Sequence, residues 1–347
     1  MTEPTDQANG RLEGSDRANR SAGRDADGQT APVASFGPDG SDAFSGPDGS
    51  VAPDGASGQA GSAAPDGSSV PDGSSGAGRR PPYRPVAGPG WALITGGAVG
   101  IGRAFAWELA RRGFDLVLAS RDADALAAVA AELHQRYGRQ VEVLPTDLAD
   151  RRDTLALAAR LEDQTRPIDL LVNNAGFGLH ASLVDLDLEL HARAIEVMAV
   201  APLILQAAAA RAMRARGHGA IVNVTSSSAV LTAGDYSAIK SFATINTESL
   251  AVELAGSGVA VMAVLPGWVQ TEFHRRAGLK ANNFPSWLGR AVWIPAAKLA
   301  AEALYDLGRG KVLSVPTGRW NFAVWLARVV PRRAIRAVSG ALTKSRT

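Results

Sequence analysis

Two residues that can move a proton stand four positions apart in the segment "GDYSAIK", Gly234 to Lys240. If this segment is helical, Tyr236 and Lys240 lie one turn apart on the same face. A free tyrosine has a pKa of about 10, and a nearby ammonium group lowers that pKa by stabilising the phenolate. The pair predicts a tyrosine that passes a proton to or from a substrate oxygen. An ordinary exposed helix turn is the alternative.

A glycine-rich segment, "TGGAVGIG", runs from Thr95 to Gly102 between an apolar strand pattern and a helical pattern. Its glycines let the backbone turn tightly and approach a ligand, and the next helix then points free N–H groups at a pyrophosphate. In this context the segment predicts a dinucleotide site, with a plain tight turn as the alternative. The residues assigned to it are Thr95, Gly96, Gly100, Ile101 and Gly102.

The end of the second predicted strand bears on the choice of cofactor. An acidic residue there would bind the ribose 2′-hydroxyl of NAD, but Ser120 and Arg121 stand in its place. Arg121 can pair with a 2′-phosphate, so we expect NADP(H) to be preferred, with NAD(H) as the alternative cofactor. The alternative is that Arg121 is an ordinary surface arginine. Asp147, after the third strand, is expected either to accept from the adenine amino group or to cap the following helix.

Small polar residues end the fourth and fifth strands. "NNAG", Asn173 to Gly176, leaves room for a nicotinamide ribose, and its amides can fix neighbouring strands. Asn174, Ala175 and Gly176 are therefore assigned to the cofactor. "TSSS" follows the fifth strand, and a serine hydroxyl there can hydrogen-bond a substrate carbonyl or simply cap the strand.

These residues need a scaffold, and the chain from Trp91 onward predicts one. Apolar strand patterns alternate with helical patterns, which indicates an α/β domain with a doubly wound parallel sheet and helices on both faces. The expected strands are 91–95, 115–120, 141–147, 168–176, 219–226, 258–267 and 311–316. A single long helix is expected over about 185–216, and another carries Tyr236.

Composition divides the 347 residues into three parts. Residues 1–85 are rich in Gly, Ser, Pro and Asp, with five "PDG" repeats, and predict a disordered tail. Residues 86–317 form the predicted nucleotide-binding catalytic domain, and 318–347 a basic amphipathic extension. The net charge of +2 is too small to argue for nucleic acid, and no cysteine is present for disulfides or thiolate metal sites. We therefore expect no bound metal. We also expect a cytoplasmic protein, because no long apolar run or signal-peptide core stands out.

The motifs occur in a fixed order: T-G-x-x-x-G-x-G, N-N-A-G, a serine after the fifth strand, Y-x-x-x-K and "PGWVQT". This ordered set resembles the short-chain dehydrogenase/reductase family over about Trp91 to Pro316. The resemblance implies a Rossmann fold, NAD(H) or NADP(H), and hydride transfer between the cofactor and a carbonyl or alcohol carbon.

By the same resemblance, Tyr236 is the acid/base, Lys240 lowers its pKa and holds the nicotinamide ribose, and Ser226 polarises the carbonyl. It also implies contacts with the nicotinamide carboxamide from Pro266, Gly267 and Thr271.

Two departures from the family pattern leave a catalytically impaired NADP(H)-binding protein as an alternative. Met198, in "MAVAP", stands where the family often has an asparagine that supports a proton relay, and methionine is a poor donor and acceptor. Only ten positions separate Ser226 from Tyr236 (236 − 226), where the family loop is usually a few residues longer. Ser227 is therefore an alternative to Ser226. His180 is expected near the cleft, as a replacement relay or a surface residue. His274 is expected in a substrate loop at about 273–294, also with a surface residue as the alternative.

The C-terminal extension combines arginines with apolar residues on both sides of Pro331, and no acidic residue follows Asp306. Two short amphipathic helices are predicted, for contact with a membrane surface or a second copy, or for docking on the chain's own core. A membrane-associated reductase of acyl or steroid-like substrates is therefore a further alternative. The expected partners are a small carbonyl or alcohol substrate and further copies of the chain in a homo-oligomer.

Overall fold

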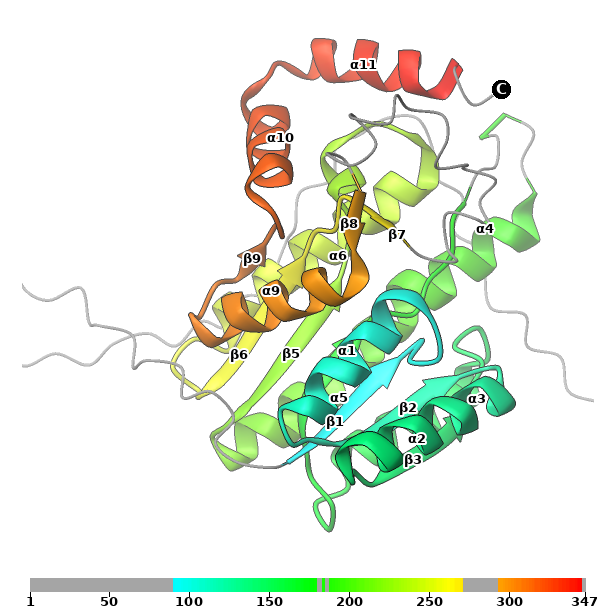
Figure 1. Ribbon diagram of the computed structural model, residues 1–347. Helices are drawn as coiled ribbons and strands as arrows, with labels where there is room; N and C mark the ends of the chain where they lie inside the picture. Colours follow the sequence, from blue (N-terminus) through cyan, green and yellow to red (C-terminus); the bar gives the residue numbers. More distant parts are fainter. Residues whose placement is uncertain (1–89, 180–182, 185–186, 271–292, 345–347) are drawn as a thin grey trace, which may run out of the picture. The chain divides into compact units, whose positions relative to one another are not determined.

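The computed structural model describes residues 90–179, 183–184, 187–270 and 293–344. All of these belong to one compact unit, Asp72–Thr347. Its centre is a seven-stranded sheet in the order β3-β2-β1-β4-β5-β6-β9, in which every neighbouring pair is parallel (Figure 1). The strands are β1 Trp91–Thr95, β2 Asp115–Ser120, β3 Val141–Pro145, β4 Ile168–Asn173, β5 Gly219–Val224, β6 Val259–Val264 and β9 Leu313–Ser314. The predicted doubly wound parallel sheet is confirmed.

Helices cover both faces of this sheet (Figure 1). One face packs against α1 Gly100–Arg111, α2 Ala123–Tyr137 and α9 Ala296–Gly308. The other packs against α3 Arg151–Glu162, α5 Ala201–Arg216 and α6 Gly234–Glu253. The central strands are buried on both sides, as in β1, where Ala92 and Ile94 face the first layer and Leu93 the second. This double burial is why they read as continuous apolar runs in the sequence.

The expected long helix over 185–216 is interrupted, which corrects the sequence prediction. The structure has α4 Leu188–Ile195, then a π-helical turn Glu196–Val200, then α5. Pro202 explains the interruption, because its ring lacks an N–H and would clash with the carbonyl four residues earlier, that of Met198. The wider turn accommodates the ring, and the Ala201 N–H donates instead to the Glu196 carbonyl. The π-helical turn places Met198 beside the candidate site.

Three small elements near the carboxyl ends of the strands had no strong sequence signal. A 3₁₀ turn, Ser227–Val230, follows β5. The strands β7 Trp268–Gln270 and β8 Trp293–Pro295 pair in parallel as a separate ribbon. The chain between them, which includes most of the expected substrate loop, lies outside the described residues, as does the predicted N-terminal tail.

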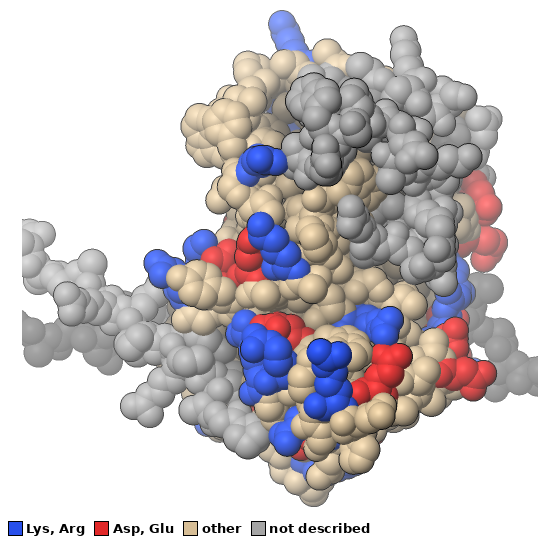
Figure 2. Space-filling model, viewed as in Figure 1, with Lys and Arg blue, Asp and Glu red and all other residues tan. Residues whose placement is uncertain are grey.

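The two C-terminal helices predicted around Pro331 are present as α10 Gly318–Val329 and α11 Arg332–Lys344. Val324 is the buried residue of α10 and packs with Ala263 and Leu265 of the β6 end. The surface over α10, at the upper left of Figure 2, is largely tan, which marks uncharged residues.

One helical stretch among the described residues, Leu188–Arg216, is long and apolar enough to cross a membrane. It is the stretch formed by α4, the π turn and α5. Leu205, Ala208 and Met213 in it are buried against the sheet. Its apolar character is thus explained by the core of this domain.

Candidate active site

The glycine-rich turn after β1 is folded as a ligand cradle. Gly96 has a left-handed backbone with φ of 68°, and its N–H donates to the Ala119 carbonyl at 2.7 Å, which ties the turn to β2. Gly102, in the first turn of α1, lies so close to this turn that a Cβ would come within 2.1 Å of the Gly96 carbonyl oxygen. Both positions therefore require glycine. Ile101, which precedes Gly102 in the first turn of α1, is half-buried against the core layer.

The N-terminus of α1 differs from those of α2 and α3. Asp122 and Asp150 cap α2 and α3 by accepting from backbone N–H groups, whereas Val99 at the start of α1 provides no side-chain cap. No acidic residue stands in the first turn of α1 either. Uncapped N–H groups at the positive end of a helix dipole favour an anion. The residues of the turn therefore fit a dinucleotide pyrophosphate.

Ser120 and Arg121 stand at the carboxyl end of β2, next to this turn. The hydroxyl of Ser120 is buried and has no hydrogen-bond partner among the described residues. Arg121 is exposed, and its positive charge reaches Asp147 closely enough to help lower the pKa of that carboxyl group. A hydroxyl donor without a partner beside an exposed guanidinium fits a 2′-phosphate.

Asp147 does not cap α3, so that alternative is wrong: Asp150 caps the helix. Asp147 instead accepts from Arg193 at 2.8 and 3.0 Å and from the Ala149 N–H at 3.1 Å. These hydrogen bonds outweigh the opposing effect of burial, so the pKa of Asp147 lies below its usual value. A carboxylate has about four acceptor positions, so room for one further donor remains.

Asn174 joins the ends of β1 and β4. Its side-chain amide donates to the carbonyls of Thr95 and Gly96 at 3.0 and 3.3 Å. The Thr95 hydroxyl in turn accepts from the backbone N–H groups of Asn174 and Ala175 at 2.9 and 3.1 Å. These bonds fix the cradle against the "NNAG" segment, in agreement with the predicted strand-fixing role of its amides.

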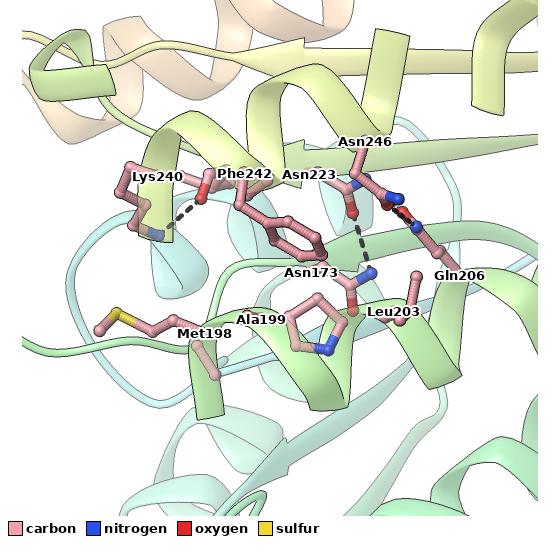
Figure 3. A pocket seen from close by; sticks show the side chains of 13 residues that line it. Asn173, Met198, Ala199, Leu203, Gln206, Asn223, Lys240, Phe242 and Asn246 are labelled. Atoms are coloured by element: carbon pink, nitrogen blue, oxygen red, sulfur yellow. Dashed lines mark hydrogen bonds between the residues drawn. The ribbon is translucent and has the colours of Figure 1, made fainter. Parts of the chain in front are cut away.

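A buried amide network supports the same edge of the sheet, and of its members only Asn173 belongs to a sequence motif, "NNAG". The Asn173 amide donates to Asn223 at 2.9 Å, and the Asn223 amide donates to Gln206 at 2.8 Å and Thr247 at 2.9 Å. Gln206 also bonds Asn246 (Figure 3). The network links β4, β5, α5 and α6, which are the elements around the predicted Tyr-Lys pair. For the other members, isolated polar residues in apolar segments were the signal in the sequence.

The structure brings Ser226, Tyr236 and Lys240 together. The Ser226 side chain is hydrogen-bonded to that of Tyr236, and Lys240 Nζ lies 5.8 Å from the centre of the Tyr236 ring. Ser227 uses its backbone N–H to bond Pro266 at 2.8 Å. Of the two serines, Ser226 is therefore the one that meets Tyr236, and the 3₁₀ turn after it makes the short connection sufficient.

The pKa values of this trio differ from the sequence-based expectation. Burial raises the pKa of Tyr236 to about 12, although the Ser226 hydrogen bond acts in the opposite direction. Burial also lowers the pKa of Lys240 to about 8. The pKa of Tyr236 is therefore raised and not lowered as expected, because burial dominates it. The Lys240 ammonium lies 5.8 Å from the centre of the Tyr236 ring and donates to the Val224 carbonyl at 3.1 Å.

Met198 and Gly176 lie next to Lys240. A Cβ on Gly176 would come within 3.1 Å of the Met198 sulfur and 3.8 Å of Lys240 Nζ. Met198 and Lys240 border a pocket between α5 and α6, in which Figure 3 shows the Met198 side chain below Lys240. Met198 thus fills space beside the lysine with an apolar side chain at the position of the expected relay residue.

The "PGW" segment after β6 borders the same region. Gly267 packs against the indole of Trp320 from α10, so closely that a Cβ would come within 2.1 Å of the ring. Trp268 and Trp293 pair across the β7–β8 ribbon with ring centres 5.6 Å apart. Thr271, His180 and His274 lie outside the described residues.

Comparison with known proteins places this arrangement in a family. A family model described as short chain dehydrogenase matches residues 90–282. The chain belongs to the short-chain dehydrogenase family. Its fold and glycine-rich turn are accordingly those of an NAD(P)-binding oxidoreductase of the Rossmann type.

Several relatives and solved structures are similar to this chain. It is 34% identical to galactitol 2-dehydrogenase (L-tagatose-forming) from Cereibacter sphaeroides over 254 residues, 67% of this chain and 95% of the relative. It is 32% identical to a very-long-chain 3-oxoacyl-CoA reductase from Anas platyrhynchos, over 55% of this chain and 64% of that protein. A short-chain dehydrogenase from Sphingobium yanoikuyae in complex with NADPH is 35% identical with a TM-score of 0.62, over 69% of this chain and 93% of that one.

Proposed function

We propose that this protein is an NADP(H)-preferring oxidoreductase that reduces a carbonyl group to an alcohol through Tyr236, Lys240 and Ser226. The observation that carries the proposal is the hydrogen-bonded Ser226–Tyr236 pair with Lys240 over the tyrosine ring. It lies beside "NNAG" and shares an edge of the sheet with the glycine cradle. Family membership supports the reaction type, and the NADPH complex of the Sphingobium relative supports the cofactor class.

The proposed chemistry assigns one task to each side chain. The bound nicotinamide supplies the hydride to the carbonyl carbon. Ser226 and Tyr236 donate hydrogen bonds to the carbonyl oxygen and polarise it, and Tyr236 gives its proton to that oxygen as charge develops. The Lys240 ammonium then stabilises the tyrosinate that remains. The alcohol leaves, and Tyr236 recovers a proton from solvent.

At neutral pH the trio has the protonation states that reduction requires. With a pKa of about 12, Tyr236 is protonated at neutral pH and holds the proton that it would donate. Lys240, with a pKa of about 8, is largely protonated at neutral pH and can stabilise the phenolate as it forms.

The preference for NADP(H) rests on the end of β2. Arg121 and the unpartnered Ser120 hydroxyl are suited to a 2′-phosphate, and no carboxylate occupies this position to bind a 2′-hydroxyl. Asp147, with one acceptor position left, is proposed to border the adenine. The glycine cradle would hold the pyrophosphate, and Asn174, Ala175, Gly176, Pro266, Gly267 and Thr271 would surround the nicotinamide end.

The partners and location remain part of the proposal. α5 and α6 expose Leu203, Phe242 and Ile245 to solvent, which supports a homo-oligomer formed through these helices. Its test is the sedimentation coefficient of the parent against Phe242→Ser with Ile245→Ser. A dimer or tetramer that becomes a monomer in the variant is expected, and a parent that is already monomeric would refute the assembly. The proposed location is the cytoplasm, as expected from the sequence.

The proposed activity is tested by NADPH oxidation with a panel of ketones and aldehydes of increasing size. The expected result is oxidation that depends on a carbonyl substrate and is faster with NADPH than with NADH. Tight NADPH binding without turnover on the whole panel would instead support the binding-protein alternative.

A further inference from the structure

The C-terminal helix α10 has two apolar faces rather than one. Trp320 and Val324, four residues apart, face the chain's own core. On the opposite side of the helix, large apolar side chains recur at the spacing of one face and remain exposed: Phe322 by 62%, Trp325 by 56%, Leu326 by 43% and Val329 by 58%. Docking on the core therefore explains the inner face and leaves the outer one without a partner among the described residues.

The outer face is also aromatic and contiguous. Phe322 and Trp325 are stacked with ring centres 5.8 Å apart. Figure 2 shows the surface over α10 as largely tan, with blue side chains beside it. Trp and Phe on an exposed helix face, next to cations, are typical of a helix that lies in a membrane interface.

The charged residues of the C-terminal segment itself are all positive. Residues 318–347 contain seven cations and no acidic residue: Arg319, Arg328, Arg332, Arg333, Arg336, Lys344 and Arg346. The four central arginines, 328, 332, 333 and 336, are exposed and form no ion pair among the described residues. Exposed cations beside an apolar helix face complement an anionic surface.

This charge argues for one occupant over another. A twofold contact between two copies through the outer face of α10 would bring the same arginines of both copies together, and like charges would oppose it. A membrane with anionic lipids instead offers an apolar interior to the stripe and negative headgroups to the arginines. We propose that the outer face of α10 and the arginines of α11 dock this protein on an anionic membrane surface.

The anchors of these helices place that surface near the candidate active site. Trp320 of α10 packs on Gly267, and the Ser339 hydroxyl of α11 accepts from the Thr232 N–H at 3.1 Å, four residues before Tyr236. Docking would hold the carboxyl end of the sheet close to the bilayer. The inference about docking stands without the proposed reaction, because it concerns binding alone.

The test is co-sedimentation of the full chain with vesicles of phosphatidylcholine alone and with vesicles that also contain phosphatidylglycerol. We expect binding to the anionic vesicles, with a blue shift of tryptophan fluorescence, and release by added salt. Phe322→Ser with Trp325→Ser should abolish the shift. Replacing Arg332, Arg333 and Arg336 with Gln should weaken partitioning roughly a hundredfold.

Matched controls separate this surface from general effects. The control variant carries Arg152→Gln, Arg211→Gln and Arg214→Gln. It removes the same charge from exposed positions on α3 and α5 and should leave vesicle binding intact. Val252→Ser removes an exposed apolar side chain on α6 and should likewise leave vesicle binding intact. All substitutions are at exposed positions, and thermal melting checks that each variant folds.

Failure of the parent to bind anionic vesicles would overturn the proposal, as would equal binding by the parent and the α11 arginine variant. Loss of a dimer in the Phe322 and Trp325 variant, without vesicle binding by the parent, would show that a second copy covers this face.

Discussion

The indole of Trp320 lies directly against the backbone of Gly267, 53 positions earlier in the chain (320 − 267), so that a Cβ on Gly267 would meet the ring at 2.1 Å. This contact joins the C-terminal helix α10 to the turn after β6, where the nicotinamide is proposed to lie. With the nicotinamide in that position, the C-terminal extension would form part of the wall of the site, although sequence analysis assigned it to a separate segment.

Gly267→Ala should force the Trp320 ring away and destabilise the protein by about 1–3 kcal/mol, the usual cost of overpacking. Chemical denaturation measures this change. Gly308→Ala is the control, because no atom lies within 4 Å of a Cβ there. Adding Trp320→Ala to Gly267→Ala should remove the clash, so the two effects should not add. Additive effects would contradict the packing described.

Lys240 should make stability depend on pH in a defined window. Its folded pKa of about 8 lies below the ordinary 10.5, so between these values the unfolded state binds a proton that the folded state does not. The free energy of unfolding should therefore rise with pH from about 8 to 10, by on the order of 2–3 kcal/mol. Tyr236 contributes in the opposite direction only above pH 10, because its folded pKa is raised.

Denaturation of Lys240→Met across this pH range checks the assignment. The variant should lose most of the rise, whereas Lys298→Met, at an exposed lysine of α9, should keep it. A parent whose stability is flat from pH 8 to 10 would show that Lys240 is not desolvated.

Arg121 should decide between the two cofactors. Arg121→Asp removes the cation and adds a carboxylate that suits a 2′-hydroxyl, so the ratio of NADPH to NADH affinity should fall by about ten- to hundredfold or more. Fluorescence titration with both cofactors measures the ratio. Arg214→Asp, which changes the same charge at the far end of α5, should leave it unchanged. If the parent binds both cofactors equally, the proposed preference is wrong.

The two serines after β5 give a matched pair. Ser226→Ala removes the hydroxyl that bonds Tyr236 and should lower kcat by about a hundredfold, the scale of one lost donor to a developing oxyanion. Ser227→Ala leaves its backbone bond to Pro266 in place and should retain most activity. Steady-state rates with NADPH distinguish the two serines. A larger loss of kcat in Ser227→Ala than in Ser226→Ala would assign the polarising role to Ser227.

Much of the scaffold could be predicted because buried parallel strands and amphipathic helices carry strong local patterns. The motifs could be located at the strand ends because each directly follows such a strand. The π turn was missed because the apolar helical period continues through Met198 and only Pro202 signals a break. The ribbon of β7 and β8 was missed because three-residue strands carry almost no pattern.

Other features depend on contacts between distant residues. The raised pKa of Tyr236 comes from burial by the folded chain, which the four-residue spacing to Lys240 does not contain. The Asn173–Asn223–Gln206 network joins residues on three elements, and its members have no common motif. The choice of Ser226 over Ser227 likewise required the geometry of the 3₁₀ turn.

Tyr236→Phe tests whether Tyr236 donates a proton to the substrate. The change keeps the ring that packs beside Lys240 and removes only the hydroxyl, so NADPH affinity and melting temperature should stay close to those of the parent. Single-turnover reduction of the best carbonyl substrate should slow by a factor of about a hundred to ten thousand, the range for loss of a general acid. A variant that reduces the substrate as fast as the parent would contradict the account.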